Sequence, residues 1–182
     1  MGSDTSSNTQ AAQSHGRCVQ CLPQVKSIMI TFKNVEDKDQ HFIEKVFRST
    51  REEELNLMNW SEDQKQSFSI MQSIAQLHDY KKNYKGAEHK IILYKKKPVG
   101  RIYLWESNAE IRIIDISLLT EFRNRGIGRT VITDIIKLAI LKNKNVTLAV
   151  GYRNPAKRLY EKLGFKKKST TDTHEQMVYR VT

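Results

Sequence analysis

Two glycines set among arginines form the stretch of this sequence best suited to bind an anion. Gly126 and Gly128 follow an isoleucine-rich segment, and Arg123, Arg125 and Arg129 lie around them. An apolar pattern with the period of a helix begins between the two glycines. The first N–H groups of a helix have no partner within it, and the helix dipole gives them partial positive charge. Because glycine lets a ligand approach the backbone closely, the stretch predicts a phosphate site.

The spacing of these residues separates several known phosphate motifs. A P-loop requires Gly-Lys-Ser/Thr, which does not follow here, and a dinucleotide fingerprint requires a third glycine where this chain has Val131. The pattern Arg123-x-x-Gly126-x-Gly128 resembles the acetyl-CoA pyrophosphate motif of the GNAT superfamily of N-acetyltransferases. A glycine-containing turn that simply opens a core helix is the alternative reading of the same residues.

A second motif follows about one strand later. Asn154 is a good N-cap, Pro155 suits the first helical position, and Gly164 suits a helix end. The run from Leu159 to Phe165 resembles the second GNAT block, which reads Leu-Tyr-Glu-Lys-Leu-Gly-Phe. Two motifs in the right order are far less frequent by chance than either alone, and the resemblance covers roughly residues 92–165.

The resemblance implies an N-acetyltransferase that uses acetyl-CoA as acetyl donor and transfers the group directly to a primary amine in a ternary complex. It implies that the central strand splays from its parallel neighbour and that the cofactor lies in the gap. Backbone groups of Ser117, Leu118 and Leu119 would then bind the cofactor, with the Leu118 N–H as the expected donor to the thioester oxygen. The other residues expected to bind the cofactor are Arg123, Asn124, Arg125, Gly126, Ile127, Gly128, Arg129, Thr130 and Asn154.

Tyr160 is the residue expected to assist the departing thiolate, although its place in an apolar stripe also fits a core aromatic. A phenol has a pKa of about 10 and a thiol about 8.5, so proton transfer is uphill but feasible, and a hydrogen bond alone would help.

Glu110 and Asp115 are the candidate general bases, and the sequence leaves the choice open. Their separation puts them on opposite faces of a strand unless a bulge intervenes, and either could instead be structural, for example through an arginine. A base matters most for side-chain amines. Deprotonating a lysine amine at pH 7 costs about 4.6 kcal/mol, against about 1 kcal/mol for an α-amine.

The pattern of the chain predicts an α/β (α+β) GNAT fold in the order β-α-α-β-β-β-α-β-α-β-β. We expect a mixed, mostly antiparallel sheet of about six to seven strands flanked by about four helices and splayed at the central strand. A capping box at Ser61 opens a long helix whose expected apolar rows are Phe68, Met71, Ala75 and Ile70, Ile74, Leu77. Other expected elements are strands over 27–35 and 146–150, a helix over 37–48, a hairpin over 90–106, a polar loop over 169–175 and a last strand over 176–181.

Residues 1–26 are expected to form a disordered arm or a cloning-derived leader, and residues 27–182 a single domain. His15, Cys18 and Cys21 give three ligands where a structural zinc site needs four, so no metal site is expected. Gly2 also fits a lipidation signal or a cloning scar. No apolar run is long enough to cross a bilayer, so we expect a soluble, cytoplasmic protein without membrane contact.

The chain has 182 residues, a formal net charge of +11 and a pI near 9.6, which favours anionic partners. Its basic runs are scattered at element ends without interleaved aromatics, so nucleic-acid binding is the less favoured reading. Three functions stay open: an N-acetyltransferase, a non-catalytic acyl-CoA sensor or scaffold, and a basic nucleic-acid-binding module. The amine acceptor is unknown, and either a monomer or a homodimer is compatible with the sequence.

Overall fold

The computed structural model describes residues 29–181. The expectations for the first 26 residues, for Gly2 and for the group His15, Cys18 and Cys21 therefore lie outside the described residues. The elements in chain order are β1 (Ile30–Asn34), η2 (Asp37–Asp39), α1 (Gln40–Asn56), α2 (Glu62–Asn83), β2 (Glu88–Tyr94), β3 (Lys97–Glu106), β4 (Glu110–Leu118), η3 (Thr120–Phe122), α3 (Ile127–Leu141), β5 (Asn145–Gly151), α4 (Lys157–Lys162), β6 (Lys166–Thr170) and β7 (His174–Tyr179). Apart from the two short 3₁₀ turns, this order is the predicted one.

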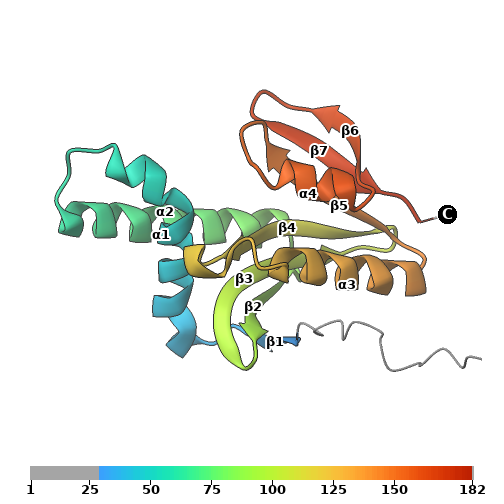
Figure 1. Cartoon of the computed structure of the whole chain (residues 1–182), viewed down its shortest axis with the longest axis horizontal. Coiled ribbons are helices and arrows are strands. Elements are labelled where there is room, and N and C mark those ends of the chain that lie inside the picture. The colour runs from blue at the N-terminus through green and yellow to red at the C-terminus, as the bar shows by residue number, and fades with distance from the viewer. Residues whose placement is uncertain (1–28, 182) are drawn as a thin grey trace, which may run out of the picture.

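The strands form one seven-stranded sheet in the order β1-β2-β3-β4-β5-β7-β6. Every neighbouring pair is antiparallel except β4 and β5, which run parallel. The predicted mixed, mostly antiparallel sheet with four α-helices is confirmed (Figure 1). Among residues 29–181, no helix has both the length and the apolarity needed to cross a membrane.

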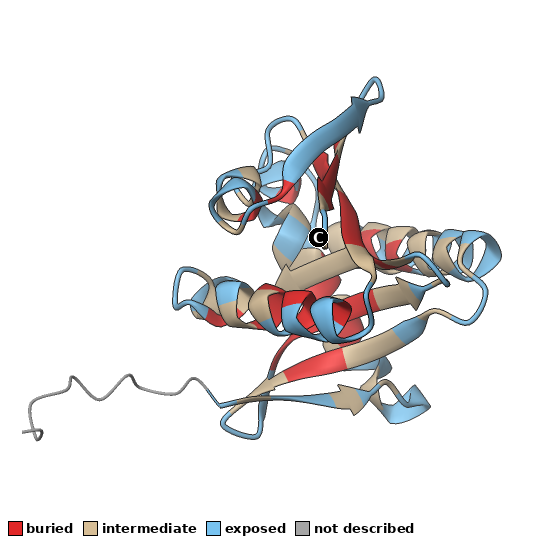
Figure 2. Cartoon of the chain, turned by 90° about the vertical axis from the view of Figure 1, so that its right-hand side faces the viewer, coloured by how far each residue is buried: buried red, intermediate tan, exposed pale blue. Residues whose placement is uncertain are grey.

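Helices α3 and α4 cover one face of the sheet, and α1 and α2 cover the other. The α3 pattern read from the sequence is correct, and its inward side chains join the central strands in the main core, which is visible as the buried interior in Figure 2. The buried residues of α3 are Ile127, Val131, Ile132, Ile135, Ile136 and Ala139. The opposite face of the sheet carries Arg101 and Tyr103, which contact Phe47 of α1 and Tyr80 of α2.

A bulge in β4 changes which residues share a face. Tyr103 pairs with Asp115, but the next residue, Leu104, pairs with Ile113, so Ile114 is an extra residue. Because one inserted residue reverses the alternation, Asp115 lies on the same face as Glu110. The bulge that would place both candidate bases on one face of the strand is therefore present.

The predicted splay between β4 and β5 is present. Their pairing ends at Ile113 and Leu148, although β4 continues to Leu118 and β5 to Gly151. The last residues of β5 remain paired with β7, up to Gly151 with His174. The C-terminal half of β4 thus has no strand on its β5 side, which leaves a gap in the sheet.

Two expectations for the second half of the chain were partly wrong. The polar loop expected over 169–175 is only a short turn, because Thr170 and Glu175 already pair between β6 and β7. Helix α4 begins at Lys157, although the Asn154 side chain does accept a hydrogen bond from the Ala156 N–H at 2.9 Å. The first turn after Asn154 is thus held by a side-chain bond before regular α-helix begins.

The N-terminal helices differ more from expectation. Helix α1 continues to Asn56, well beyond the expected end at Arg48. The capping box of α2 is present, and in its expected apolar rows Phe68, Ile70 and Leu77 are half-buried while Met71 and Ile74 are exposed. The buried residues of α2 are Ser69 and Ser73, whose hydroxyls bond back to helix carbonyls at 2.8 and 2.9 Å.

Candidate functional site

The start of α3 presents backbone N–H groups that are free to bind an anion. Gly126 is the N-cap with φ of 82° and ψ of −8°, and no side chain caps the helix. The first hydrogen bond within the helix is donated by the Thr130 N–H to the Gly126 carbonyl at 3.0 Å. The N–H groups of Ile127, Gly128 and Arg129 therefore have no acceptor within the helix. A left-handed residue at this turn favours glycine, as the sequence predicts.

Gly128 connects this helix start to two other elements. A Cβ atom placed on Gly128 would have only the Leu118 and Leu159 side chains nearby, each at 3.9 Å. Leu118 ends β4 beside the splay, and Leu159 precedes Tyr160 in α4. The uncapped amides, the gap in the sheet and the α4 tyrosine therefore meet in one region.

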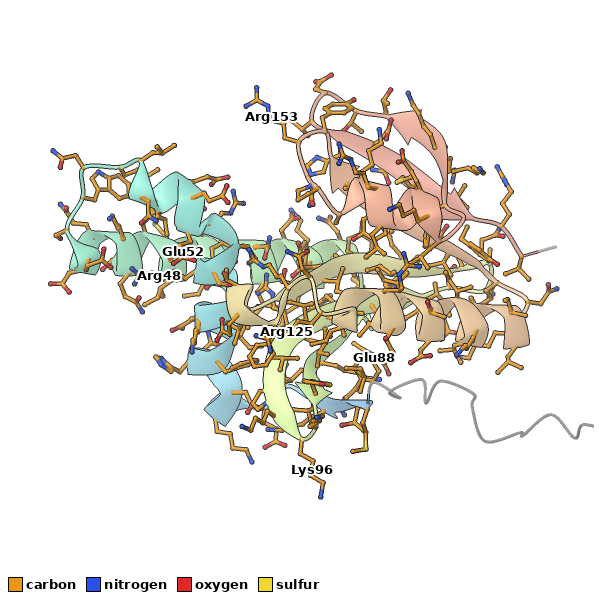
Figure 3. The ribbon with its side chains drawn as sticks, in the orientation of Figure 1. Arg48, Glu52, Glu88, Lys96, Arg125 and Arg153 are labelled. Atoms are coloured by element: carbon orange, nitrogen blue, oxygen red, sulfur yellow. The ribbon has the colours of Figure 1, made fainter. Side chains whose placement is uncertain are left out.

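The three arginines of the motif have different surroundings. Arg123 is half-buried, and its Nε donates to the Leu118 carbonyl at 2.9 Å while Nη2 donates to the Ser49 carbonyl at 2.9 Å. Arg125 is exposed and lies over the Phe122 ring, 5.5 Å from its centre (Figure 3). Arg129 is exposed, as is Asn124, whose φ is 58°. Arg123 thus braces β4 against α1 with both sides of its guanidinium, a role that its spacing in the motif does not reveal.

We expect Arg123→Ala to lower the free energy of unfolding by about 2 kcal/mol, since two charge-assisted hydrogen bonds to carbonyls are lost. The matched control is Arg125→Ala, which removes the same charge from an exposed site and should change stability by less than about 0.5 kcal/mol. Urea unfolding of both variants measures the difference. Equal free energies of unfolding for the two variants would contradict a stabilising role of the Arg123 hydrogen bonds.

The backbone register decides which amides face the splay. The Leu119 N–H donates to the Val99 carbonyl at 2.9 Å, so Leu119 is turned toward β3. Because hydrogen-bonded and free residues alternate along an antiparallel strand, Ser117 is turned the same way, whereas Ile116 and Leu118 are turned toward the gap. The backbone groups of Ser117 and Leu119, which were expected to bind the cofactor, thus face β3, and those of Ile116 and Leu118 face the gap. The Leu118 N–H, the expected donor to the thioester oxygen, is among the groups that face the gap.

Tyr160 is the buried residue of α4, with 7% of its surface exposed. The helix ends in a Schellman motif, because the Phe165 N–H donates to the Tyr160 carbonyl and the Gly164 N–H to the Glu161 carbonyl. The rings of Tyr160 and Phe165 meet edge to face at 5.8 Å. Burial raises the pKa of Tyr160 to about 12, and the negative charge of Asp115 adds to the shift. The Tyr160 hydroxyl therefore stays protonated at physiological pH. It also lies close enough to Asp115 to feel the charge of that carboxylate.

Asp115 is held from two sides. The Arg101 guanidinium lies 2.9 Å from one carboxylate oxygen, and the Ser117 hydroxyl donates to the other at 2.9 Å. Arg101 is buried and also donates to the Gln76 side chain of α2 at 2.7 Å. Sequence reasoning missed Arg101 and Gln76. The only signal was a charged residue within the otherwise apolar β3 run, in the strand paired with Asp115.

Two further aromatic groups surround this ion pair on the same sheet face. His89 and Tyr80 both pack on Tyr103, with ring centres 4.8 and 5.3 Å away. Burial, reinforced by the positive charge of Arg101, lowers the pKa of His89 to about 4, so His89 is neutral at pH 7. Burial also raises the pKa of Tyr80. The surroundings of Asp115 thus contain neutral polar groups that sequence patterns did not single out.

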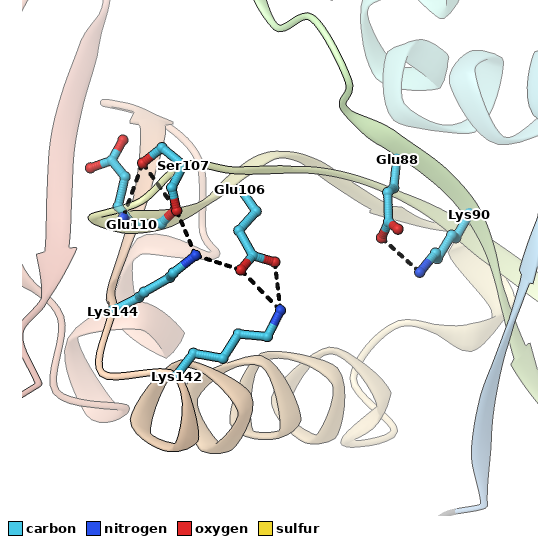
Figure 4. Close-up of polar contacts among 7 residues, drawn as sticks. All are labelled: Glu88, Lys90, Glu106, Ser107, Glu110, Lys142 and Lys144. Carbon is cyan, nitrogen blue, oxygen red and sulfur yellow. Dashed lines mark hydrogen bonds and ion pairs between the residues drawn. The ribbon is translucent and has the colours of Figure 1, made fainter.

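Glu110 lies apart from these groups. It is the first residue of β4 and pairs with Asn145 at the closed end of the β4–β5 ladder. Its N–H donates to the Ser107 hydroxyl at 3.1 Å, beside a cluster in which Glu106 binds Lys142 and Lys144 (Figure 4). At the usual rise along a strand, Asp115 is roughly 13 Å away. The structure brings Asp115 and Tyr160 to the splay but not Glu110.

Comparison with known proteins agrees with this architecture. Residues 53–165 match the model of the acetyltransferase (GNAT) family. The PaiA N-acetyltransferase of Thermoplasma acidophilum, solved with coenzyme A, aligns with a TM-score of 0.61 and 18% identity over 84% of this chain and 99% of its own. An acetyltransferase of Thermus thermophilus gives a TM-score of 0.62 and 16% identity over 84% and 97%.

The spermidine N-acetyltransferase of Vibrio cholerae, solved with coenzyme A and spermine, gives a TM-score of 0.56 and 17% identity over 82% of this chain and 94% of its own. No curated protein sequence matched. At these identities the solved structures establish the fold alone. The family match includes both glycine-containing motifs and both splayed strands, β4 and β5. This chain belongs to the GNAT family of acetyltransferases.

Proposed function

We propose that this protein transfers the acetyl group of acetyl-CoA directly to a primary amine. The observation that carries the proposal is the position of Gly128, whose neighbours are the end of β4 at the splay and the α4 segment next to Tyr160. Uncapped helix amides, a gap with free strand amides and a protonated phenol thus share one region. Two structural neighbours were solved with coenzyme A, which supports the same donor here.

The residues proposed to bind the donor fall into two groups. The N–H groups of Ile127, Gly128 and Arg129, with the exposed charges of Arg125 and Arg129, suit the pyrophosphate. The backbone groups of Ile116, which face the gap, suit the amides of the pantetheine arm, whereas the Leu118 carbonyl already accepts a hydrogen bond from Arg123. Asn124 and Thr130, which lie next to the α3 amides in the chain, and Asn154, which precedes α4, complete the proposed set.

The acetyl thioester supplies an activated carbonyl carbon. In our proposal the Leu118 N–H donates a hydrogen bond to the carbonyl oxygen, where negative charge develops during attack. The Tyr160 hydroxyl donates to the departing sulfur. Full proton transfer from a phenol of pKa about 12 to a thiolate of pKa about 8.5 is uphill by about 4.8 kcal/mol, so Tyr160 acts mainly as a hydrogen-bond donor.

Of the two candidate bases, we propose Asp115, because Glu110 lies at the closed end of the β4–β5 ladder. Arg101 and Ser117 fix the Asp115 carboxylate, which can then orient the amine and accept its proton directly or through a water.

We expect Asp115→Asn to lower kcat/KM for the amine by at least about tenfold, since a carboxylate that orients the acceptor is lost. Glu110→Gln is the matched control and should stay within about twofold of wild type. Thermal unfolding must accompany the assay, because Asp115→Asn leaves the buried Arg101 charge without its counter-ion. A larger activity loss in Glu110→Gln than in Asp115→Asn would overturn the assignment.

The alternative functions are separated by two measurements. Calorimetry with acetyl-CoA should show binding, and no binding at micromolar concentrations would remove both the enzyme and the acyl-CoA sensor. Thiol release with a panel of amines, including polyamines and proteins, should show turnover. Binding without thiol release from any amine would favour the sensor. Binding of nucleic acid with no binding of acetyl-CoA would favour the third reading.

A further inference from the structure

The outward face of α2 is apolar where a surface helix is usually polar. Met71 is 60% exposed and Ile74 is 55% exposed, and both lie near the middle of this helix of 22 residues. The buried side of the same helix carries Ser69 and Ser73. Met71 and Ile74 thus form an exposed apolar patch beside a buried serine pair, a feature typical of an interaction surface.

A concavity continues this face toward the α1–α2 connection. It has a volume of about 570 Å³ and is lined by Trp60, Asp63, Gln64, Ser67, Phe68 and Met71. The Trp60 ring stands edge to face on Phe68 at 5.1 Å, so the walls of the concavity are already packed. The α1–α2 connection projects beyond the sheet in Figure 1, so another molecule can reach it.

We propose that this face of α2 joins two copies of the chain, with their α2 helices antiparallel around a two-fold axis. The charges of the helix are self-complementary in that arrangement. Its first turn carries Glu62 and Asp63, and its last turn carries Lys81 and Lys82. Antiparallel pairing places each acidic end against a basic end and also aligns the helix dipoles favourably.

The spacing of residues fixes the register of the pair. An axis that passes between Gln72 and Ser73 places Met71 of one copy opposite Ile74 of the other. The same axis places Asp63 opposite Lys82, because both are equally far from it. The lysine stem then crosses the concavity, where it can cover Trp60 while its charge meets Asp63.

The charge around the concavity favours this basic occupant. Residues 52–64 contain five acidic side chains and no lysine or arginine. Two of the five, Glu54 and Glu62, form ion pairs with basic residues of the same chain, whereas Asp63 lines the concavity. A surface that is both acidic and apolar fits a partner that is both basic and apolar. The C-terminal half of α2 in a second copy provides Ile74, His78 and Lys82 at helical spacing.

The first test is the mass of the full chain in solution at micromolar concentrations. Wild type should sediment at about twice 21.2 kDa. Met71→Glu should raise the dimer dissociation constant at least about 100-fold, because each substitution acts twice at a two-fold interface. Leu141→Glu adds the same charge on α3 at a side chain that is 84% exposed and should leave the dimer intact.

The second test uses charge reversal. Asp63→Lys and Lys82→Glu should each weaken self-association, whereas an equal mixture of the two variants should form a heterodimer of wild-type strength. Restoration occurs only if residue 63 faces residue 82 across the axis. A monomeric wild type would overturn the proposal and leave the face to another occupant, such as the first 28 residues. A dimer that survives Met71→Glu, or a mixture that does not recover, would equally overturn it.

Discussion

Tyr160→Phe is expected to slow a single turnover of acetyl transfer by about 10- to 100-fold, the worth of a hydrogen bond to a charged sulfur, while acetyl-CoA affinity stays within about twofold. The substitution removes only the hydroxyl proposed to donate to the departing sulfur. The ring and its 5.8 Å contact with Phe165 remain, so the end of α4 keeps its packing. The loss should therefore appear in the rate of the chemical step rather than in binding or stability.

The matched control is Tyr179→Phe, because Tyr179 also packs on Phe165, with ring centres 5.9 Å apart. That variant should turn over at the wild-type rate. Rapid mixing with acetyl-CoA and a saturating amine measures the step without interference from product release. A wild-type single-turnover rate in Tyr160→Phe would reduce Tyr160 to a packing residue.

The raised pKa of the Tyr160 hydroxyl also predicts how the rate of acetyl transfer depends on pH. Because the folded pKa of Tyr160 is about 12, its hydroxyl remains a donor across the neutral and moderately alkaline range. The rate should rise with pH as the amine loses its proton, with no fall from Tyr160 below about pH 11. A descending limb near pH 9 that disappears in Tyr160→Phe would contradict the raised pKa.

Gly128→Ala is expected to weaken acetyl-CoA binding by about 10- to 100-fold without weakening the fold. The added Cβ meets only two leucine side chains, each at 3.9 Å, which is ordinary contact. Alanine is also the better helix former, so the free energy of unfolding should be unchanged or slightly higher. The methyl group would instead occupy the space through which we propose the pyrophosphate approaches the helix amides.

Calorimetry and urea unfolding of Gly128→Ala test both halves of that expectation. Gly126→Ala is a poor substitute, because Gly126 has φ of 82° and any side chain there is strained. If Gly128→Ala is stable and binds acetyl-CoA as wild type does, the pyrophosphate lies elsewhere. Lower affinity combined with lower stability would not support the site either, because misfolding would explain both.

The order of the elements was predictable because each carries local signals. The capping residue Ser61 begins α2, Gly126 begins α3 and Gly164 ends α4, and all three do what their residue types favour. The β-branched segment before Gly126 forms the central strand as expected. Signals that begin or end a helix depend on neighbouring residues in the chain, so they can be recognised without knowledge of the tertiary structure.

The directions of backbone and side chains were less predictable, because they depend on contacts between distant segments. The extra residue Ile114 decides the face of Asp115, and nothing in the sequence marks it. The register against β3 decides that Leu118 rather than Ser117 faces the splay. Arg123 braces Ser49, which lies 74 residues earlier in the chain. Each outcome is set by pairing partners that a local pattern does not name.

The apolar rows of α2 show the same limit of a local pattern. Periodicity shows that Met71 and Ile74 share a face but not what covers it. In the structure Ser69 and Ser73 are buried, whereas Met71 and Ile74 are exposed. The period of the helix can therefore be read from the sequence, but the side that packs inward cannot.

The most direct test of the account is a stoichiometric turnover followed by mass spectrometry. Wild-type protein, acetyl-CoA and an amine found by the thiol-release screen are mixed, and the free thiol, the acetylated amine and the intact chain are measured together. Direct transfer predicts one acetylated amine for each thiol released, with no chain that gains an acetyl group during turnover. Thiol release that is coupled to an acetylated chain intermediate, or binding of acetyl-CoA with no acetylated amine, would contradict it.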